Sequence, residues 1–403
     1  MNNHSKTFPN PFRPGAGHMP PYLAGREAEQ QEFQRLLKQE TILDNMVLTG
    51  LRGVGKTVLL ERLKPTAIKE GWLWVGTDLS ETISVSEANL ATRIITDLSV
   101  VTSALTLNAG TSEQAGFTGT ASPILQPMNY AFLNRKYEET PGLVVDKLKA
   151  VLEFVWSVLK QTDRRGIIFA YDEAQNLSDN APKEQYPLSV LLDLFQSIQR
   201  KGVPFMLVLV GLPTLFPKLV EARTYAERMF RIVSLSQLNE KDRKDAIVKP
   251  VQDAKCPIKF SDPSVEIIAD LSGGYPYFIQ FIGREVFDVW IQRLTAGVET
   301  AIPVEEITRK LDTDFFTGRW ARVTDRQREM MYVISNLDSC DGEFSVQEIV
   351  EESAVVLSKG FGNSHVNQIL VALTNQGLVY KNRHGKYSFA VPLMAGFIRR
   401  QYV

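Results

Sequence analysis

Residues 50–57 read Gly50-Leu51-Arg52-Gly53-Val54-Gly55-Lys56-Thr57 and match the pattern G-x-x-x-x-G-K-[ST] at every fixed position. A short apolar run, Met46–Thr49, precedes this segment, and a stretch with helical periodicity, Thr57–Leu63, follows it. The motif needs this strand–loop–helix context, because the context places backbone N–H groups and a helix N-terminus around phosphate oxygens. The sequence therefore predicts a phosphate-binding loop.

Each residue type in this loop has a chemical role. Gly53 and Gly55 allow positive φ, so that main-chain N–H groups can turn inward toward an anion. Lys56 would reach the β- and γ-phosphates of a nucleotide, and the Thr57 hydroxyl would ligate Mg²⁺. We expect the nucleotide to contact Gly50, Leu51, Arg52, Gly53, Val54, Gly55, Lys56, Thr57 and Val58.

A second run, Ile167-Ile168-Phe169-Ala170-Tyr171-Asp172-Glu173, is typical of a buried strand that ends in two carboxylates. Such an ending alone is weak evidence, because ordinary strands also become polar where they enter a loop. Together with the phosphate loop, it predicts that Asp172 holds Mg²⁺, usually through water, and that Glu173 orients and polarises an attacking water. Ligands of open α/β sheets bind at this end of the strands.

Apolar strands alternate with helical stretches between Met46 and Val210, which predicts βαβ units and a mainly parallel sheet. Val101–Pro141 interrupts the alternation. It is rich in Ala, Thr, Ser, Gly and Asn and has little periodicity, so we expect a long loop or insertion there. The expected strands are Met46–Thr49, Trp72–Thr77, Ile167–Tyr171 and Pro204–Val210, and the helices between them include Ser86–Leu98, Pro141–Leu159 and Leu188–Gln199.

The two ends of the chain differ from this core. Phe8–Pro21 is rich in proline and predicts an extended strap. After Leu235 the pattern is helical, and from Thr324 three helices and a hairpin follow in the order of a winged helix-turn-helix. The expected organisation is a strap and helix at 1–40, an α/β core at 41–235 with the insertion at about 101–141, a helical segment at 236–320, and a winged helix at 321–403.

Composition excludes several classes of protein. The chain has 403 residues, with 45 Lys and Arg against 46 Asp and Glu, so it is not a polybasic nucleic-acid coat. Cys256 and Cys340 are its two cysteines and cannot form a disulfide framework, which favours a reduced, intracellular setting. The longest apolar run, Val203–Leu212, is too short to span a bilayer. We expect a cytoplasmic protein without a membrane segment.

The phosphate loop and the acidic strand end resemble the Walker A and Walker B motifs of the AAA+ superfamily. The likeness is closer to bacterial and archaeal ATPases related to origin-recognition initiators and to the STAND signalling ATPases, and it extends from Asn10 to the C-terminus. It implies an α/β fold: a parallel-sheet P-loop NTPase with a RecA-like core, followed by a helical lid and a winged helix-turn-helix domain. It also implies ATP as the nucleotide, with Mg²⁺.

The same resemblance implies further site residues. Pro20–Glu27 resembles the segment that passes the adenine, with Tyr22, Leu23 and Ala24 near the base; a simple proline-rich tether is the alternative. Tyr225–Ile232 resembles the stretch that carries an arginine finger. Arg228 is the best match and would act across a subunit interface or within the chain, whereas an ordinary solvated helix face is the alternative.

Two landmarks of the family depart from its pattern. The polar sensor residue expected after the strand Pro204–Val210 is replaced by Gly211, with Thr214 as a weak substitute. In the lid, Leu271–Tyr277 resembles the Gly-Gly-x-Pro turn, whose Pro276 would lie near the nucleotide. Many family members have an arginine directly after this proline, and this chain has Tyr277. We therefore expect slow ATP hydrolysis.

The predicted winged helix leaves its partner open. From Arg319 to Val403 there are ten Lys and Arg against eight Asp and Glu, and the expected recognition helix, Ser364–Gln376, has neither Lys nor Arg. The turn Lys381–Lys386 is basic and could contact a phosphate backbone, but the weak charge favours a protein-contact or autoinhibitory role. Three functions remain: an ATP-driven switch that acts on a partner protein, a DNA-binding initiator or transposition-type loader that assembles on duplex DNA as a nucleotide-dependent homo-oligomer, and a nucleotide-binding scaffold without turnover.

Overall fold

The computed structural model describes residues 8–15, 17–112, 122–254, 256, 258–296, 301–383 and 385–402. The chain divides into two compact units. The sheet unit contains Glu27–Thr49 and Leu59–Ser234, and the lid unit contains Met1–Arg26, Gly50–Val58 and Leu235–Val403. The phosphate loop thus belongs to the same unit as the C-terminal half of the chain.

The main sheet has five strands in the order β2-β5-β6-β1-β7. The pairs β1–β6, β5–β6 and β2–β5 are parallel, which confirms the predicted parallel sheet. Every residue of β1, β5 and β6 is buried, as expected for strands covered on both faces. The strands are β1 (Asn45–Gly50), β2 (Trp72–Val75), β5 (Gly166–Tyr171), β6 (Phe205–Gly211) and β7 (Phe230–Leu235), of which the sequence did not predict β7.

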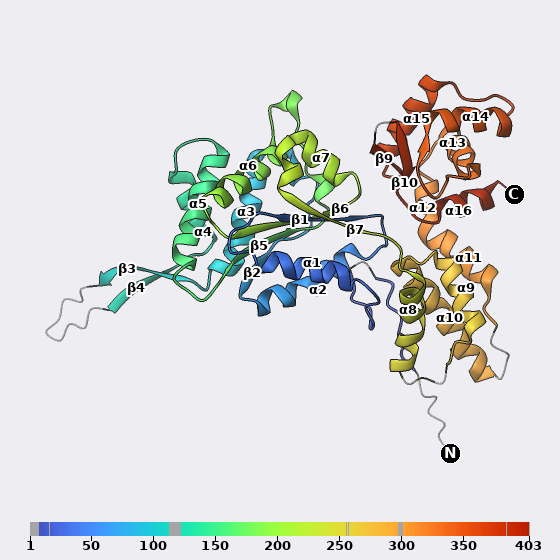
Figure 1. Ribbon diagram of the computed structural model, residues 1–403, viewed down its shortest axis with the longest axis horizontal. Helices are drawn as coiled ribbons and strands as arrows, with labels where there is room; N and C mark the ends of the chain where they lie inside the picture. The colour runs from blue at the N-terminus through green and yellow to red at the C-terminus, as the bar shows by residue number, and fades with distance from the viewer. Residues whose placement is uncertain are drawn as a thin grey trace, which may run out of the picture. The chain divides into compact units, whose positions relative to one another are not determined.

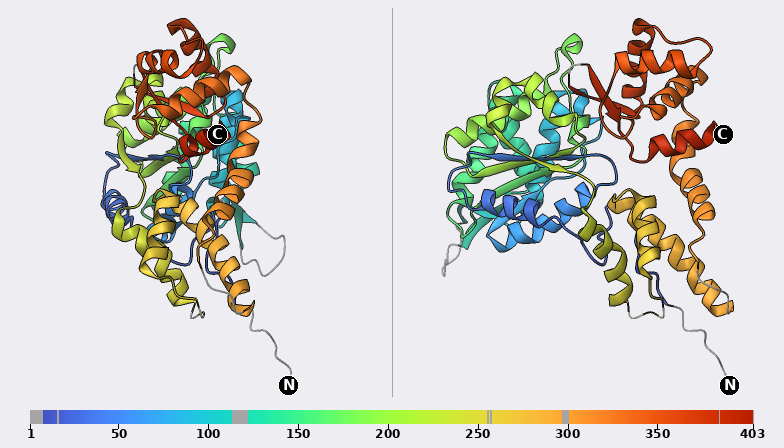
Figure 2. Two further views of the ribbon diagram at one scale, coloured as in Figure 1. Left: turned by 90° about the vertical axis from the view of Figure 1, so that its right-hand side faces the viewer. Right: turned by 45° about the vertical axis from the view of Figure 1, so that its right-hand side comes forward.

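Helices cover both faces of this sheet. Within the sheet unit, α1 lies on one face, and α3, α5 and α6 lie on the other (Figures 1 and 2). Aromatic side chains fill the space under α6, where the ring centroids of Phe169 and Phe195 are 5.1 Å apart in an edge-to-face arrangement. The helices are α1 (Glu27–Leu37), α2 (Lys56–Lys69), α3 (Glu87–Thr102), α4 (Tyr130–Glu139), α5 (Val144–Leu159), α6 (Pro187–Arg200) and α7 (Leu215–Ala222), and short 3-10 turns are η1 (Ile83–Val85), η2 (Ala174–Asn176), η3 (Ala181–Lys183) and η4 (Thr224–Arg228).

Of the two alternatives for 101–141, the long loop is wrong for the described residues, and the insertion stays a prediction. β3 (Thr106–Ser112) and β4 (Ser122–Pro127) form an antiparallel ribbon, and α4 follows; residues 113–121 lie outside the described part of the chain. Backbone hydrogen bonds pair the two strands of the ribbon. Such pairing does not require alternating apolar residues, so the sequence carries no periodic signal for it. The start of α4 has a local signal, because the side chain of Asn129 accepts a hydrogen bond from the Phe132 N–H at 3.0 Å. Similarly, α2 continues through Pro65, where the sequence suggested an end.

The lid unit consists of helices and one small sheet. Its antiparallel sheet has the order β8-β10-β9. Along the chain, β8 lies between two helices, and β9 and β10 form a hairpin after the next helix, an order that fits the predicted winged helix. The capping pairs Thr324–Gln327 and Ser345–Glu348 begin two of these helices. The elements are α8 (Glu240–Asp253), α9 (Asp262–Ser272), α10 (Pro276–Ala296), α11 (Val304–Leu311), the π-turn η5 (Asp312–Phe316), α12 (Thr317–Trp320), α13 (Asp325–Asn336), β8 (Phe344–Ser345), α14 (Val346–Val356), α15 (Asn363–Asn375), β9 (Val379–Arg383), β10 (Lys386–Phe389) and α16 (Met394–Gln401).

The proline-rich strap is packed onto α10 within the lid unit. Phe12 is 2% exposed, and a Cβ at Gly283 would come within 2.6 Å of its ring. The Asn10 side chain donates to the carbonyl of Arg284 at 2.9 Å, and the Arg13 N–H donates to Gln280 at 3.0 Å. The described part of the strap is therefore a fixed element. Among the residues described, no helix has the combination of length and apolar content needed to cross a membrane.

Candidate nucleotide-binding site

The loop between β1 and α2 has the backbone that phosphate binding requires. Gly53 has φ +81° and Gly55 has φ +89°, a region that L side chains rarely adopt. Space is also restricted at Gly53, because a Cβ there would lie 3.1 Å from the Cβ of Tyr277. Both glycines predicted to turn the loop therefore do so.

Lys56 lies over the beginning of the loop. Its Nζ donates to the carbonyl oxygens of Gly50 and Leu51, at 2.9 Å and 3.0 Å. Both bonds hold the ammonium group beside the loop backbone, where the motif places the phosphates of a nucleotide.

Other parts of the lid unit hold the loop in place. The Tyr277 N–H donates to the carbonyl of Gly53 at 3.0 Å, and the ring of Pro276 lies 4.0 Å from a Cβ built at Gly55. Arg26 Nη2 donates to the carbonyl of Val54 at 3.1 Å and to that of Ser236 at 2.6 Å. The predicted contact residue Pro276 is therefore beside the loop, and Arg26 is a loop contact that sequence reasoning missed.

A second arginine that the sequence analysis did not single out lies near the loop. The Arg319 guanidinium sits 4.3 Å from the ring centroid of Phe315, whose ring is 5.3 Å from that of Tyr277. Burial and the nearby positive charge of Arg52 lower the pKa of Arg319. The lid unit thus places a cation from α12 close to the loop, although Tyr277 occupies the position where a lid arginine was expected.

The predicted adenine contacts have other neighbours in the structure. Tyr22 and Leu23 are half-buried, and the Tyr22 hydroxyl accepts a hydrogen bond from Lys249 Nζ at 2.8 Å. The same ammonium lies 4.5 Å from the Tyr22 ring centroid. These contacts fix Tyr22 against α8, and its contact with a base remains a prediction.

In the sheet unit, β5 delivers the two predicted carboxylates. Asp172 is 4% exposed, and its Oδ1 accepts a hydrogen bond from the Glu173 N–H at 2.7 Å. Glu173 itself is exposed and has a left-handed backbone, with φ +50° and ψ +33°. The register pairs Tyr171 with Leu209 and Thr49 with Gly211, so β5 and β1 end at the same edge of the sheet.

The donor types predicted for Mg²⁺ fit this ion. Thr57 supplies a hydroxyl oxygen at the start of α2, and Asp172 supplies a carboxylate oxygen at the end of β5. Mg²⁺ prefers oxygen ligands and usually binds through one or two protein groups together with phosphates and water. The donor types therefore agree with the metal that the motif implies, and a joint role of Thr57 and Asp172 stays a prediction.

Arg228 is the exposed last residue of the 3-10 turn η4, rather than part of a helix face. The turn is fixed by its neighbour Arg223, whose Nε and Nη2 donate to the two oxygens of Asp193 at 2.9 Å and 2.7 Å. The Tyr225 hydroxyl also donates to Asp193, at 2.6 Å. Burial opposes ionisation of this carboxyl, but the bonds from Arg223 and Tyr225 outweigh it and lower the pKa of Asp193.

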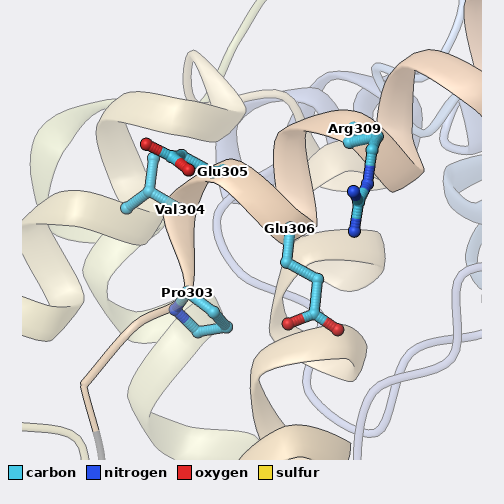
Figure 3. Close-up of a pocket in the computed structure, with 5 residues that line it drawn as sticks. All are labelled: Pro303, Val304, Glu305, Glu306 and Arg309. Carbon is cyan, nitrogen blue, oxygen red and sulfur yellow. The ribbon is translucent and has the colours of Figure 1, made fainter.

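A separate pocket at the start of α11 does not offer a comparable site. It is lined by Pro303, Val304, Glu305, Glu306 and Arg309 (Figure 3). Its two carboxylates and single guanidinium come from one helix, so this lining does not gather cations around a phosphate. The glycine-rich loop is therefore the better candidate for nucleotide binding.

Comparisons with known proteins agree with this fold. The structure is similar to that of a Walker-type ATPase of Pyrococcus abyssi, with 14% identity, a TM-score of 0.57, and coverage of 94% of this chain and 96% of that one. It is also similar to the ORC2 protein of Aeropyrum pernix in its ADP form, with 15% identity, a TM-score of 0.53, and coverage of 96% and 97%. The same protein in ADPNP–ADP complexes gives 13% identity and a TM-score of 0.52, with coverage of 96% and 98%.

At these identities the likeness shows the fold alone, which this chain shares with those proteins over nearly its whole length. Residues 313–398 match a family described as a domain of unknown function, DUF8462. No curated protein matches the sequence.

Proposed function

We propose that this protein binds ATP with Mg²⁺, hydrolyses it slowly, and acts as a switch that couples its nucleotide state to a partner protein through residues 321–403. The phosphate loop is the observation that carries the proposal. Gly53 and Gly55 have the required positive φ, and the Lys56 ammonium group is bonded to the loop carbonyls of Gly50 and Leu51.

The proposed chemistry gives each of the predicted site residues one role. Thr57 and Asp172 would hold Mg²⁺, which would supply positive charge against the charge that develops on the transferred phosphoryl group. Glu173 would orient a water for attack on the γ-phosphate and accept its proton. Tyr277 stands where many related ATPases have an arginine, so we expect turnover below about 1 s⁻¹, against about 10 s⁻¹ for a typical enzyme.

Contacts within the lid unit support coupling between the loop and the C-terminal module. The Tyr277 N–H bonds to the loop carbonyl of Gly53 at 3.0 Å, and the next residue, Phe278, stacks on Phe316 with ring centroids 6.2 Å apart. Phe316 in turn stacks on Phe397 of α16 at 5.0 Å. Because packed aromatic rings cannot shift independently, a change at the loop is transmitted toward residues 321–403.

The charges of the wing, which we define as β9, β10 and the turn between them, favour a protein partner over duplex DNA. Arg383 pairs with Glu343 at 2.9 Å, and Lys386 pairs with Glu348 at 3.1 Å. The hydrogen bonds from Arg383 and Ser345, respectively, lower the pKa of Glu343 and that of Glu348, so both acids stay charged at neutral pH. Cations already paired in this way add little to phosphate binding.

We further propose that Arg228 acts on the nucleotide of a neighbouring copy in a nucleotide-dependent homo-oligomer. Its exposure and the rigid support of η4 by the Arg223–Asp193 pair favour such a role. Light scattering with and without ATP would show the larger species only with nucleotide.

The central test measures ATP affinity and steady-state turnover in matched variants. Lys56→Ala should weaken ATP binding about 100-fold, because it removes a hydrogen-bonding cation worth about 2–3 kcal/mol. Lys69→Ala, which removes an exposed lysine from the same helix, should leave affinity unchanged. Glu173→Gln should keep the affinity and reduce turnover by a factor of about 10²–10⁴.

These measurements separate a nucleotide-hydrolysing protein from a nucleotide-binding scaffold. Unchanged ATP affinity in Lys56→Ala would show that this loop is not the phosphate-binding site. Binding without turnover in the wild type would leave a scaffold, and equal turnover in Glu173→Gln would place the water-activating group elsewhere.

A further inference from the structure

The side chain of Gln175 connects Glu173 to the end of β6. Its Nε2 donates to Oε2 of Glu173, and its Oε1 accepts a hydrogen bond from the Leu212 N–H at 3.1 Å. Glu173 offers only acceptors on this carboxylate and the Leu212 N–H is only a donor, so a single orientation of the amide satisfies both partners. We propose that Gln175 is a positioning residue for Glu173, a role that rests on the proposed ATP hydrolysis.

The backbone around Gln175 is fixed at several points. Lys218 of α7 donates its Nζ to the carbonyl of Gln175 at 2.7 Å. The next residue, Asn176, donates its backbone N–H to the Glu173 carbonyl and its side chain to the Leu79 carbonyl, both at 2.9 Å. An amide carried on so constrained a turn can hold its partner in one place.

Glu173 needs such a partner because it is exposed. A free glutamate samples many rotamers, and fixing one costs about 1.5–2 kcal/mol of conformational entropy. Its left-handed backbone, with φ +50°, is also rare for a residue with a side chain, and strained residues of this kind concentrate at functional sites. The bond from Gln175 selects one arrangement of a carboxylate that the water-activating role requires to be precise.

Gly211 shows how β6 makes room for this amide. The sequence lacks the polar side chain that related ATPases have near the end of this strand, and a Cβ at Gly211 would lie 2.5 Å from Oε1 of Gln175. Gly211 is not among the residues with positive φ, so the glycine is needed for space rather than for conformation. Gln175 therefore brings a polar group to the strand end where the missing sensor residue would stand.

The test is a double-mutant cycle on Gln175 and Gly211, read as turnover, KM and ATP affinity. Gln175→Ala should lower kcat about tenfold to 100-fold, the effect of losing a hydrogen bond to a charged group, and should leave KM and ATP affinity within about twofold. Gly211→Ala should reproduce this loss by displacing the amide while leaving Gln175 and Glu173 in the sequence. In the Gln175→Ala background, Gly211→Ala should add less than about threefold.

The control is Gln185→Ala, which removes another side-chain amide of the sheet unit, one whose Oε1 accepts the Glu87 N–H at 2.9 Å. It should leave kcat unchanged even where it lowers the melting temperature. A merely structural role for Gln175 would appear as a loss of ATP affinity and melting temperature with kcat preserved.

Additive effects of the two substitutions, or full turnover in Gln175→Ala, would overturn the proposal. A wild-type protein that binds ATP without hydrolysing it would instead overturn the proposed function, and with it the role of Gln175.

Discussion

The phosphate loop and the wing both carry basic side chains, but these have different partners. Lys56 bonds to two backbone carbonyls, whereas Arg383 and Lys386 bond to carboxylates of Glu343 and Glu348. The carboxylates of Glu343 and Glu348 offset part of the positive charge that the wing presents to a phosphate backbone, whereas the loop keeps its ammonium group beside its own main chain. The number of cations in a region therefore predicts anion binding less well than their placement.

The backbone adds a second difference between the two regions. Gly53 and Gly55 hold the loop in left-handed conformations, with φ +81° and +89°, so its N–H groups can converge on one anion. In the wing, the strands β9 and β10 use backbone groups to pair with each other in an antiparallel register that shifts between Lys386 and Tyr387. The loop therefore has the backbone conformation that suits phosphate binding through the main chain, whereas the described strands of the wing have the conformation of a sheet.

The largest predicted effect, which tests the comparison most strongly, is expected for a substitution at Gly53. Gly53→Ala forces a side chain into a left-handed backbone and brings its Cβ to 3.1 Å from that of Tyr277. The loop must move, and losing one or two backbone hydrogen bonds to a charged phosphate should weaken ATP binding about 30-fold to 100-fold. Isothermal titration with ATP measures the change.

Gly202→Ala is the matched control, because Gly202 has φ +75° and no atom within 4 Å of an added Cβ. Both variants should lose about 1–2 kcal/mol of stability from backbone strain. Only Gly53→Ala should lose affinity; equal affinity in both variants would show that the loop backbone does not grip the nucleotide.

Sequence analysis predicted the loop and the acidic strand end because both are local. Glycines, lysine and threonine at fixed spacing determine the loop within a few residues, and an apolar run predicts β5 directly. The parallel sheet followed from the alternation of strands and helices, and the structure confirms it.

What the sequence missed depends on residues far apart in the chain. Arg26 donates to the Ser236 carbonyl, 210 positions away, and Leu212 bonds to Gln175 from 37 positions away. No periodicity encodes such pairs, because each depends on how separate elements pack. The same holds for the C-terminal module: the composition of residues 319–403 gave a small positive charge, but only the structure shows Arg383 paired with Glu343.

The second prediction tests the wing by removing the carboxylates that pair with its cations. Glu343→Gln together with Glu348→Gln frees Arg383 and Lys386, and Gln still serves as the capping residue of α14. If unpaired cations bind phosphate, the slope of log K against log salt for random duplex DNA should steepen by about 2, and affinity at low salt should rise about tenfold. Fluorescence anisotropy over a salt series measures both.

Its control is Glu351→Gln together with Glu352→Gln, which makes the same change in net charge on α14. This variant should keep the shallow slope of log K against log salt that is expected of the wild type. A wild-type slope already as steep as that of the released variant would favour the alternative of a DNA-binding initiator or loader.

The smallest effect concerns Arg223, a cation that bonds to a carboxylate as those of the wing do. Asp193→Asn leaves its guanidinium without the anionic partner that fixes η4, and should lower the free energy of unfolding at pH 7 by about 1 kcal/mol, a factor of about 5. The pKa of Asp193 is lowered in the folded state, so this contribution is present above the unfolded pKa of about 3.9 and is lost as pH falls through the folded value. Urea unfolding from pH 7 to about pH 2 should therefore show a difference that stays constant down to about pH 4 and narrows below it. Asp163→Asn, at a carboxylate that is 92% exposed, should differ from the wild type by less than about 0.5 kcal/mol throughout. A constant difference across the pH range would mean that Asp193 supports η4 by packing rather than by charge, so that pairing with a carboxylate would not be what fixes the turn that carries Arg228.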